Sequence, residues 1–314
     1  MAVVAVDIGG TKTAAALVTR DGRVLSSATA PTPGREGRAA IVATVVRLAR
    51  GLIDGMPDAA VAGVGIGTAG EVDTRTGTIV ASTETLAGWT GTPLADLVRD
   101  GLADLLPADA VVDVQNDVDA HAAGEFRLGA AAGARSALIV AVGTGVGAGI
   151  IVEGRPLRGA HHTAGALAHL PVPGAEHLRC PCGRPGHLEA IGSGVGMHRH
   201  YLSLGGDVAV RDARAVVARA RDGDARAQRA LVESAAAIGR ALAGAVALLD
   251  PETVVVTGGV ADIGDAWWEP MRRAYVAAAI DALQHVPIVP GLLGGNAPLL
   301  GAAACAWERR GDHA

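Results

Sequence analysis

The stretch that decides the fold lies at the N-terminus, where residues 3–12 read VVAVDIGGTK. An apolar run ends there in two glycines, and a second apolar run follows at residues 14–18. Two apolar runs joined by a tight glycine turn predict a β-hairpin. The dipeptide Asp21-Gly22 then favours another hairpin, with its second strand at residues 24–29.

Residues 140–152 repeat this opening pattern and read VAVGTGVGAGIIV. They again form an apolar run, a Gly/Thr turn and a second apolar run. Two copies that lie a domain apart predict a duplicated α/β unit. Other strands are expected at residues 61–66, 78–81, 111–114 and 253–256, and helices, from apolar residues at three-and-four spacing, at residues 38–52, 225–249 and 298–309.

The composition excludes several classes of protein. Hydrophobic residues make up 50% of the 314 residues, aromatic residues 2%, and the net charge is −5. Ala, Val and Leu therefore form most of the core, and a nucleic-acid partner is not expected without a basic or stacking surface. No continuous apolar run reaches the roughly 18 residues of a membrane span, and Asp7 interrupts the first apolar stretch as no signal peptide would. We expect a cytoplasmic protein with no membrane partner.

Three glycine turns each follow a predicted strand, at residues 7–12, 143–147 and 257–260. Glycine lets the backbone approach a ligand and direct N–H groups at phosphate oxygens, although a tight hairpin needs glycine in any case. Lys12, the only lysine among 27 basic residues, lies in the first turn. Together these features favour a cradle for phosphates and a nucleoside. Its candidate residues are Asp7, Gly9, Gly10, Thr11, Lys12, Gly143, Thr144, Gly145, Gly258 and Gly259.

Polar residues 116–121, which read NDVDAH, follow the strand expected at residues 111–114. A carboxylate at this position is often only a helix N-cap. The same position also suits a general base that accepts a proton from a substrate hydroxyl, with Asn116 holding a neighbouring hydroxyl beside Asp117. The segment alone does not decide between these roles.

Cys180 and Cys182 lie in a Pro/Gly loop with histidines on both sides. This pattern is typical of a closed zinc site, although two cytosolic cysteines among scattered histidines are the ordinary alternative. His177 also lies nearby, so the complete ligand set stays open at this point.

These ordered motifs resemble those of the ROK (repressor, open reading frame, kinase) family over nearly the whole chain. The resemblance implies a two-lobed actin-like ATPase (ribonuclease H-like) fold, with the active site between the lobes. Residues 1–116 and 297–314 are expected to form the smaller lobe, and residues 117–296 the larger, with a zinc loop near residues 169–189. A homodimer or homotetramer is also expected.

The resemblance also assigns roles to individual residues. Asp117 is implied as the catalytic base. Asn116, Thr83, His169 and Glu189 are implied to bind the sugar. The zinc ligands are implied to be His169, Cys180, Cys182 and His187, with His187 at the position of a cysteine in most of the family.

A second departure from the family concerns the substrate. Sugar kinases of the family carry a glutamate three residues before the zinc histidine, and this chain has Ala166 there. Loss of a charged acceptor for sugar hydroxyls weakens hexose binding by about 1.5–3 kcal/mol. Ordinary glucokinase activity is therefore in question, although the phosphoryl-transfer residues are all present.

The sequence thus predicts an ATP-dependent kinase that uses Mg²⁺ and a structural Zn²⁺ and phosphorylates a primary hydroxyl of a hexose or hexose-like ring. An amino sugar or a C7-cyclitol is the alternative substrate, and polyphosphate the alternative donor. The competing class is a sugar-sensing transcriptional repressor, and a non-catalytic sugar-binding regulator is a third class. A DNA-binding repressor of the family would carry a helix-turn-helix ahead of Asp7, where this sequence has six residues.

Overall fold

The computed structural model describes residues 1–82 and 85–311, which divide into two compact units. Unit 1 comprises Met1–Gly133, Pro156–Ala164 and the residues from Leu292 onward. Unit 2 comprises Ala134–Arg155 and Gly165–Gly291. The chain therefore passes from each unit to the other more than once.

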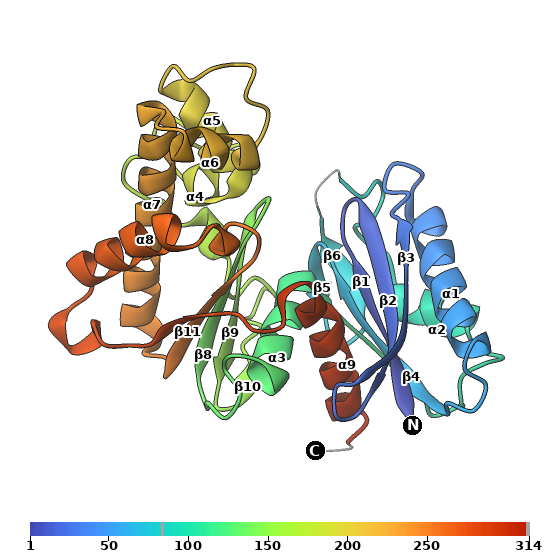
Figure 1. Cartoon of the computed structure of the whole chain (residues 1–314). Coiled ribbons are helices and arrows are strands. Elements are labelled where there is room, and N and C mark those ends of the chain that lie inside the picture. The colour runs from blue at the N-terminus through green and yellow to red at the C-terminus, as the bar shows by residue number, and fades with distance from the viewer. Residues whose placement is uncertain (83–84, 312–314) are drawn as a thin grey trace. The chain divides into compact units, whose positions relative to one another are not determined.

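Unit 1 is built on a five-stranded sheet in the order β3-β2-β1-β4-β7 (Figure 1). The predicted hairpin is confirmed: β1 pairs antiparallel with β2, and Ile8 faces Thr13 across the glycine turn. β3 is antiparallel to β2, whereas β4 and β7 add in parallel. The strands are β1 (Ala2–Ile8), β2 (Lys12–Thr19), β3 (Val24–Pro31), β4 (Val61–Thr68) and β7 (Val111–Asn116), and a separate small sheet holds β5 (Glu71–Asp73) and β6 (Thr78–Ala81).

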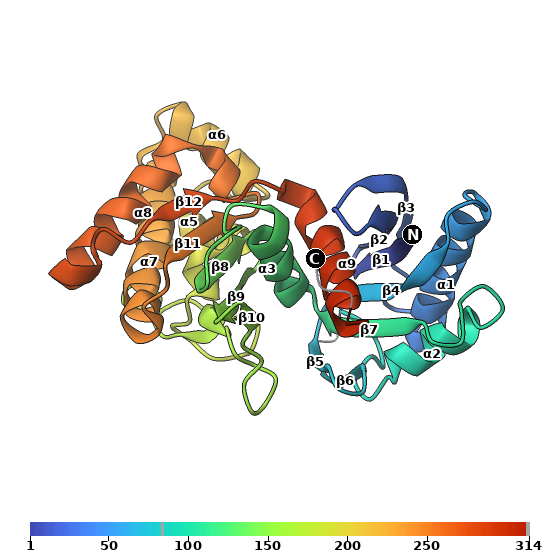
Figure 2. The same cartoon turned by 90° about the horizontal axis from the view of Figure 1, so that it is seen from below.

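Helices cover both faces of this sheet, which explains why its central strands are almost continuously apolar. Val4 and Val6 of β1 join the core that contains Ile41 of α1, whereas Val3 and Ala5, on the opposite face, pack with residues of α9. Figure 2 shows α1 and α9 on opposite sides of the strands. The helices of unit 1 are α1 (Arg38–Asp54), α2 (Leu94–Gly101), α3 (Asp117–Leu128) and α9 (Ala297–Arg309), with a short 3₁₀ turn at Gly294–Asn296.

Unit 2 repeats the arrangement with the sheet order β10-β9-β8-β11-β12. β8 and β9 form an antiparallel hairpin around the second glycine turn, and β11 and β12 add in parallel. The predicted duplication is therefore confirmed. The strands are β8 (Ala137–Val142), β9 (Val146–Val152), β10 (Arg155–Pro156), β11 (Thr253–Thr257) and β12 (Ile288–Pro290).

The longest helix, α7, is the central core helix of unit 2. In the described part of the chain, α7 alone is long and apolar enough to meet the length and composition of a membrane span. However, 61% of its most apolar window is buried inside the protein. The sequence analysis counted no such run, because Glu233 and Arg240 interrupt it. The helices of unit 2 are α4 (Glu189–Gly192), α5 (Gly194–Ser203), α6 (Ala213–Arg221), α7 (Ala225–Leu249) and α8 (Asp265–Ala278), with 3₁₀ turns at Leu167–His169, Ala261–Ile263 and Asp281–Leu283.

The division into units differs from the predicted lobes, which separate at residue 116. Helix α3 lies in unit 1 because it packs tightly against α9. A Cβ on Gly301 would lie 1.7 Å from the carbonyl oxygen of Ala120, and a Cβ on Gly124 would lie 2.3 Å from that of Ala297. Glycines at these contacts let the two helix backbones approach closely, which the apolar pattern of either helix alone does not reveal.

Candidate active site

Asn116 and Asp117 lie where β7 ends and α3 begins. The Asn116 Oδ1 accepts a hydrogen bond from the Val118 N–H at 2.9 Å, and its Nδ2 donates to the Gly70 carbonyl at 2.9 Å. Asn116 is therefore the N-cap, and Asp117 is the first residue of the helix. Asp117 also accepts from the Val118 N–H through Oδ1, at 2.9 Å. The capping role considered for this segment thus belongs mainly to Asn116.

Asp117 lines a cavity of about 390 Å³ in unit 1, together with Glu71, Gly70 and Ser82. Burial raises the pKa of Asp117, and the charge of Asp119 raises it further. Burial and the charges of Asp119 and Asp117 raise the pKa of Glu71 to about 7. The cavity is therefore acidic, with carboxylates that take up protons closer to neutral pH than usual.

Glu71 was missed by the sequence analysis. It lies in the short strand β5, and no motif marks it. Only its place in the fold brings it close to Asp117, from which it is separated by more than 40 residues along the chain.

Asp7, at the end of β1, lies near both Asp117 and Lys12. Burial and the charge of Asp117 raise the pKa of Asp7 to about 6, and Lys12 opposes this shift. Thr11 and Lys12 are exposed in the turn, which is closed by a 3.0 Å hydrogen bond from the Gly9 N–H to the Lys12 carbonyl. A Cβ on Gly10 would lie 2.6 Å from the Thr85 side chain. The first glycine turn thus presents one cation beside a buried carboxylate.

The other two glycine turns meet at one cavity of unit 2. This cavity has a volume of about 700 Å³, and Gly143, Thr144 and Gly259 line it. Gly258 has a positive φ of 92° and shapes the turn, because a Cβ there would lie 2.5 Å from the Val142 carbonyl. The sequence analysis missed four basic residues that also line the cavity: His198, Arg199, Arg211 and Arg214.

Gly145, in the second glycine turn, lies directly against Glu189. A Cβ at Gly145 would lie 2.9 Å from the Glu189 Oε2, and the same oxygen accepts a hydrogen bond from the Val146 N–H at 3.0 Å. Glu189, the first residue of α4, therefore packs directly against the second glycine turn.

A compact group of two histidines and two cysteines lies in the loop before α4. The ligand atoms of His169, Cys180, Cys182 and His187 all lie within 4.8 Å of one another. The Sγ of Cys180 lies 3.6 Å from the Nδ1 of His169, and the Sγ of Cys182 lies 3.2 Å from the Nδ1 of His187. Two sulfurs and two imidazoles are a donor set that suits tetrahedral zinc.

His177, the alternative ligand, points elsewhere. Its Nε2 lies 3.3 Å from the Ser203 Oγ, and its ring centroid lies 5.5 Å from that of His200. The loop that carries Cys180 and Cys182 is held in shape by a 2.9 Å hydrogen bond from the Cys180 N–H to the Arg184 carbonyl.

Thr83 and Ala166 are the remaining positions of the predicted sugar site. Thr83 lies outside the described residues. Ala166 directly precedes the 3₁₀ turn that carries His169, and its carbonyl accepts a hydrogen bond from the His169 N–H at 3.1 Å. Its methyl group offers no acceptor to a ligand.

Comparisons with known proteins agree with this description. A model of the ROK family matches residues 3–309. The chain is 32% identical to a glucokinase of Streptomyces coelicolor, with 97% of each chain covered, and 32% identical to an N-acetylmannosamine kinase of Escherichia fergusonii, with 98% of each covered. A solved ROK glucokinase of Streptomyces griseus, in complex with glucose and AMPPNP, superposes with a TM-score of 0.81 at 32% identity and covers 98% of this chain and 100% of its own.

The predicted actin-like ATPase fold is confirmed by these likenesses and by the duplicated sheet order. The family match spans both units and all of the motifs that carried the resemblance. The chain is a member of the ROK family.

Proposed function

We propose that this protein is an ATP-dependent sugar kinase that phosphorylates a primary hydroxyl of a hexose or hexose-like ring. The observation that carries the proposal is the carboxylate of Asp117 in the acidic cavity of unit 1, at a strand end beside the capping residue Asn116. The names of the relatives, which are glucokinases and amino-sugar kinases, and the glucose and AMPPNP bound to the similar Streptomyces griseus enzyme support it.

Asp117 acts as the general base in this proposal. Its raised pKa makes the carboxylate a better proton acceptor than an ordinary aspartate, and one oxygen is oriented by the Val118 N–H. The carboxylate takes the proton of the attacking hydroxyl as the oxygen bonds to the γ-phosphorus, and the bond from this phosphorus to the β–γ bridging oxygen breaks, so that ADP leaves. Asn116, fixed by its bonds to Val118 and Gly70, orients an adjacent hydroxyl.

Unit 2 binds the nucleotide through the cavity at the second and third glycine turns. The backbone of the turn at Thr144 and the nearby arginines suit the negative charge of phosphates, whereas the Gly143 N–H already donates to the Gly145 carbonyl at 2.9 Å. Mg²⁺ held by the β- and γ-phosphates would neutralise their charge during transfer. Zinc held by His169, Cys180, Cys182 and His187 would fix the loop that leads to Glu189. Because Glu189 accepts a hydrogen bond from the Val146 N–H, this would also fix the second glycine turn.

The substrate is a hexose such as glucose, or alternatively an amino sugar or a C7-cyclitol. Glucose is favoured by the names of the relatives. An amino sugar is favoured by one feature of the site: Glu71 adds a second carboxylate to the cavity of Asp117, and a protonated amine would be attracted there. Ala166 supports the same alternative, because it lacks the acceptor that hexose kinases of the family use.

Replacing the base tests the proposed reaction. Asp117→Asn keeps the shape of the side chain, and we expect turnover with ATP to fall about 10²- to 10⁴-fold while nucleotide binding and folding persist. Asp109→Asn, at an exposed carboxylate of the same unit, is the matched control and should keep full activity. The substrates are glucose, mannose, their amino and N-acetyl derivatives, and C7-cyclitols, each with ATP and with polyphosphate. A variant at Asp117 that keeps a tenth of the wild-type rate would contradict the assignment, and sugar binding without turnover would indicate a regulator.

A further inference from the structure

Arg158 contacts both sides of the Asn116–Asp117 pair. Its Nη2 donates a hydrogen bond to the Gln115 Oε1 at 2.5 Å, and its Nη1 forms an ion pair with the Asp119 carboxylate. Gln115 comes directly before Asn116, and Asp119 lies in the first turn of α3, two residues after Asp117. One guanidinium thus joins the end of strand β7 to the first turn of helix α3.

This contact is made by a segment that has returned from the other unit. Pro156–Ala164 begins at the end of β10 and belongs to unit 1, so Arg158 reaches the strand–helix junction from a segment far from it in the sequence. Its side chain is 24% exposed and that of Asp119 17%. Gln115 is fully buried, and its Oε1 also lies 3.5 Å from the Sγ of Cys305 on α9. The guanidinium is therefore anchored in a largely buried polar network.

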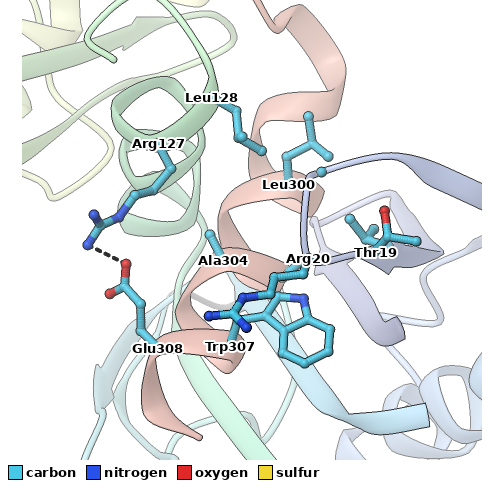
Figure 3. Close-up of a pocket in the computed structure, with 11 residues that line it drawn as sticks. Thr19, Arg20, Arg127, Leu128, Leu300, Ala304, Trp307 and Glu308 are labelled. Atoms are coloured by element: carbon cyan, nitrogen blue, oxygen red, sulfur yellow. Dashed lines mark ion pairs between the residues drawn. The ribbon is translucent and has the colours of Figure 1, made fainter. Parts of the chain in front are cut away.

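The opposite end of α3 has a different attachment. There Arg127 forms an ion pair with Glu308 of α9, as Figure 3 shows, and both side chains are more than a third exposed. That pair lies at the rim of a groove lined by Leu128, Leu300 and Trp307, far along the helix from Asp117. Ion pairs therefore tie α3 at both ends, but only the pair of Arg158 adjoins the base.

We propose that Arg158 is a positioning residue for phosphoryl transfer, which fixes the Asn116–Asp117 pair by bridging Gln115 to Asp119 and offsets the charge of Asp119 beside the base. The proposal rests on the proposed function of Asp117. Arg158 is suited to this task because the planar fork of its guanidinium reaches two acceptors at once, whereas a lysine ammonium is a single point charge. Small displacements of a base from its working geometry lower rates steeply.

The charge offset has a predictable sign. The carboxylates near Asp117 are those of Asp7 on β1, Glu71 on β5 and Asp119 on α3; among nearby cations, Arg158 pairs with Asp119, and Lys12 lies beside Asp7. Removal of Arg158 leaves the charge of Asp119 uncompensated, and this raises the pKa of Asp117. Protonation then inactivates the base at a higher pH than in the wild-type protein.

The test compares Arg158→Met, Arg158→Lys and the double variant Arg158→Met/Asp119→Asn with the wild-type protein. We expect Arg158→Met to lower kcat about 10- to 100-fold, to change the KM for ATP less than about twofold, and to move the acidic limb of the pH profile to higher pH. Arg158→Lys should leave the acidic limb of the pH profile in place, because the positive charge remains, and should lower kcat. The double variant should return the acidic limb of the pH profile toward its wild-type position, because the charge of Asp119 is also removed. Its kcat should stay low, because the hydrogen bond to Gln115 is still missing.

Arg127→Met is the matched control, since it removes an arginine ion pair from the same helix, and it should leave kcat and the pH profile unchanged. The pKa of Asp117 is also measured directly by carbon-13 NMR of its carboxyl group, assigned with Asp117→Asn. This readout needs no turnover, so a shifted pKa in a protein that phosphorylates no sugar would uphold the charge offset by Arg158 and refute the proposed function. A wild-type rate per folded molecule and an unmoved pKa in Arg158→Met would overturn the inference. If Arg158→Met does not fold, Arg158→Lys and the double variant test the inference instead: a wild-type kcat in both would overturn it.

Discussion

The buried carboxylate of Asp7 should destabilise the fold at neutral pH. Its pKa is about 6 in the folded protein, against 3.8 for an ordinary aspartate, mainly because burial disfavours its charged form. The shift of about two pKa units corresponds to about 3 kcal/mol at 1.36 kcal/mol per unit. Because the folded-state pKa is raised, this cost is absent below pH 4, grows as the pH rises to 6, and is complete above it.

Asp7→Asn removes the titrating group and keeps its shape. We expect the variant to be more stable than the wild-type protein by up to about 3 kcal/mol at pH 8, or about 6 to 12 °C in Tm for a unit of this size. The gain should be much smaller at pH 4, where Asp7 is protonated in the folded state and partly protonated in the unfolded state. It should also be smaller in an Asp117→Asn background, because the charge of Asp117 contributes to the shift.

The measurement is urea unfolding followed by tryptophan fluorescence at pH 4, 5, 6 and 8. Asp21→Asn is the matched control, because a hydrogen bond from Thr19 lowers the pKa of that exposed carboxylate, and its removal should not stabilise the protein. An equal gain at pH 4 and pH 8 would show that charge burial is not the cause. No gain at pH 8 would refute the reasoning.

Three further predictions concern zinc, the substrate and the core. Cys182→Ser should lose the single zinc per chain and reduce thermal stability, whereas His177→Ala should keep both; metal analysis of protein purified without chelators checks this, and zinc-free wild-type protein would contradict it. Ala166→Glu should raise kcat/KM for glucose about tenfold through one restored charge-assisted hydrogen bond and lower it for the best alternative substrate, and a loss for glucose in a wild-type enzyme that prefers glucose would show the role of Ala166 to be wrong. Gly301→Ala should lower the unfolding free energy by about 1–3 kcal/mol or more, because the new Cβ would lie 1.7 Å from the Ala120 carbonyl; chemical denaturation measures it, and an unchanged midpoint would mean that α3 and α9 pack less tightly than described.

Much of the candidate site could be predicted because its residues lie within short stretches of sequence. Asp7 and Lys12 belong to one strand and its turn, and Asn116 and Asp117 are adjacent. Cys180, Cys182 and His187 lie in one loop, so their spacing already suggests a shared ligand. The choice of His187 over His177 depends on the direction in which the loop turns, and the sequence left that open.

Residues that act from a distance escaped the sequence analysis. Glu71 and Arg158 stand in no local pattern with Asp117, and they approach it only after strands and helices have packed. The arginines at the cavity of unit 2 were missed for the same reason, since Arg199 on α5, Arg211 before α6 and Arg214 on α6 are ordinary polar residues until the glycine turns lie next to them.

The sequence by itself determined the two glycine-turn hairpins and the central strands of the fold: apolar runs and turn glycines specify them, because these depend on the period of the backbone and on local φ and ψ angles. It also determined that the unit occurs twice. Only the tertiary structure decided that α3 belongs with α9, because that choice depends on the fit of Gly301 and Gly124 against a backbone far away in the sequence. The same packing sets the pKa of Asp7 and Asp117, since burial and neighbouring charges arise only when distant segments meet.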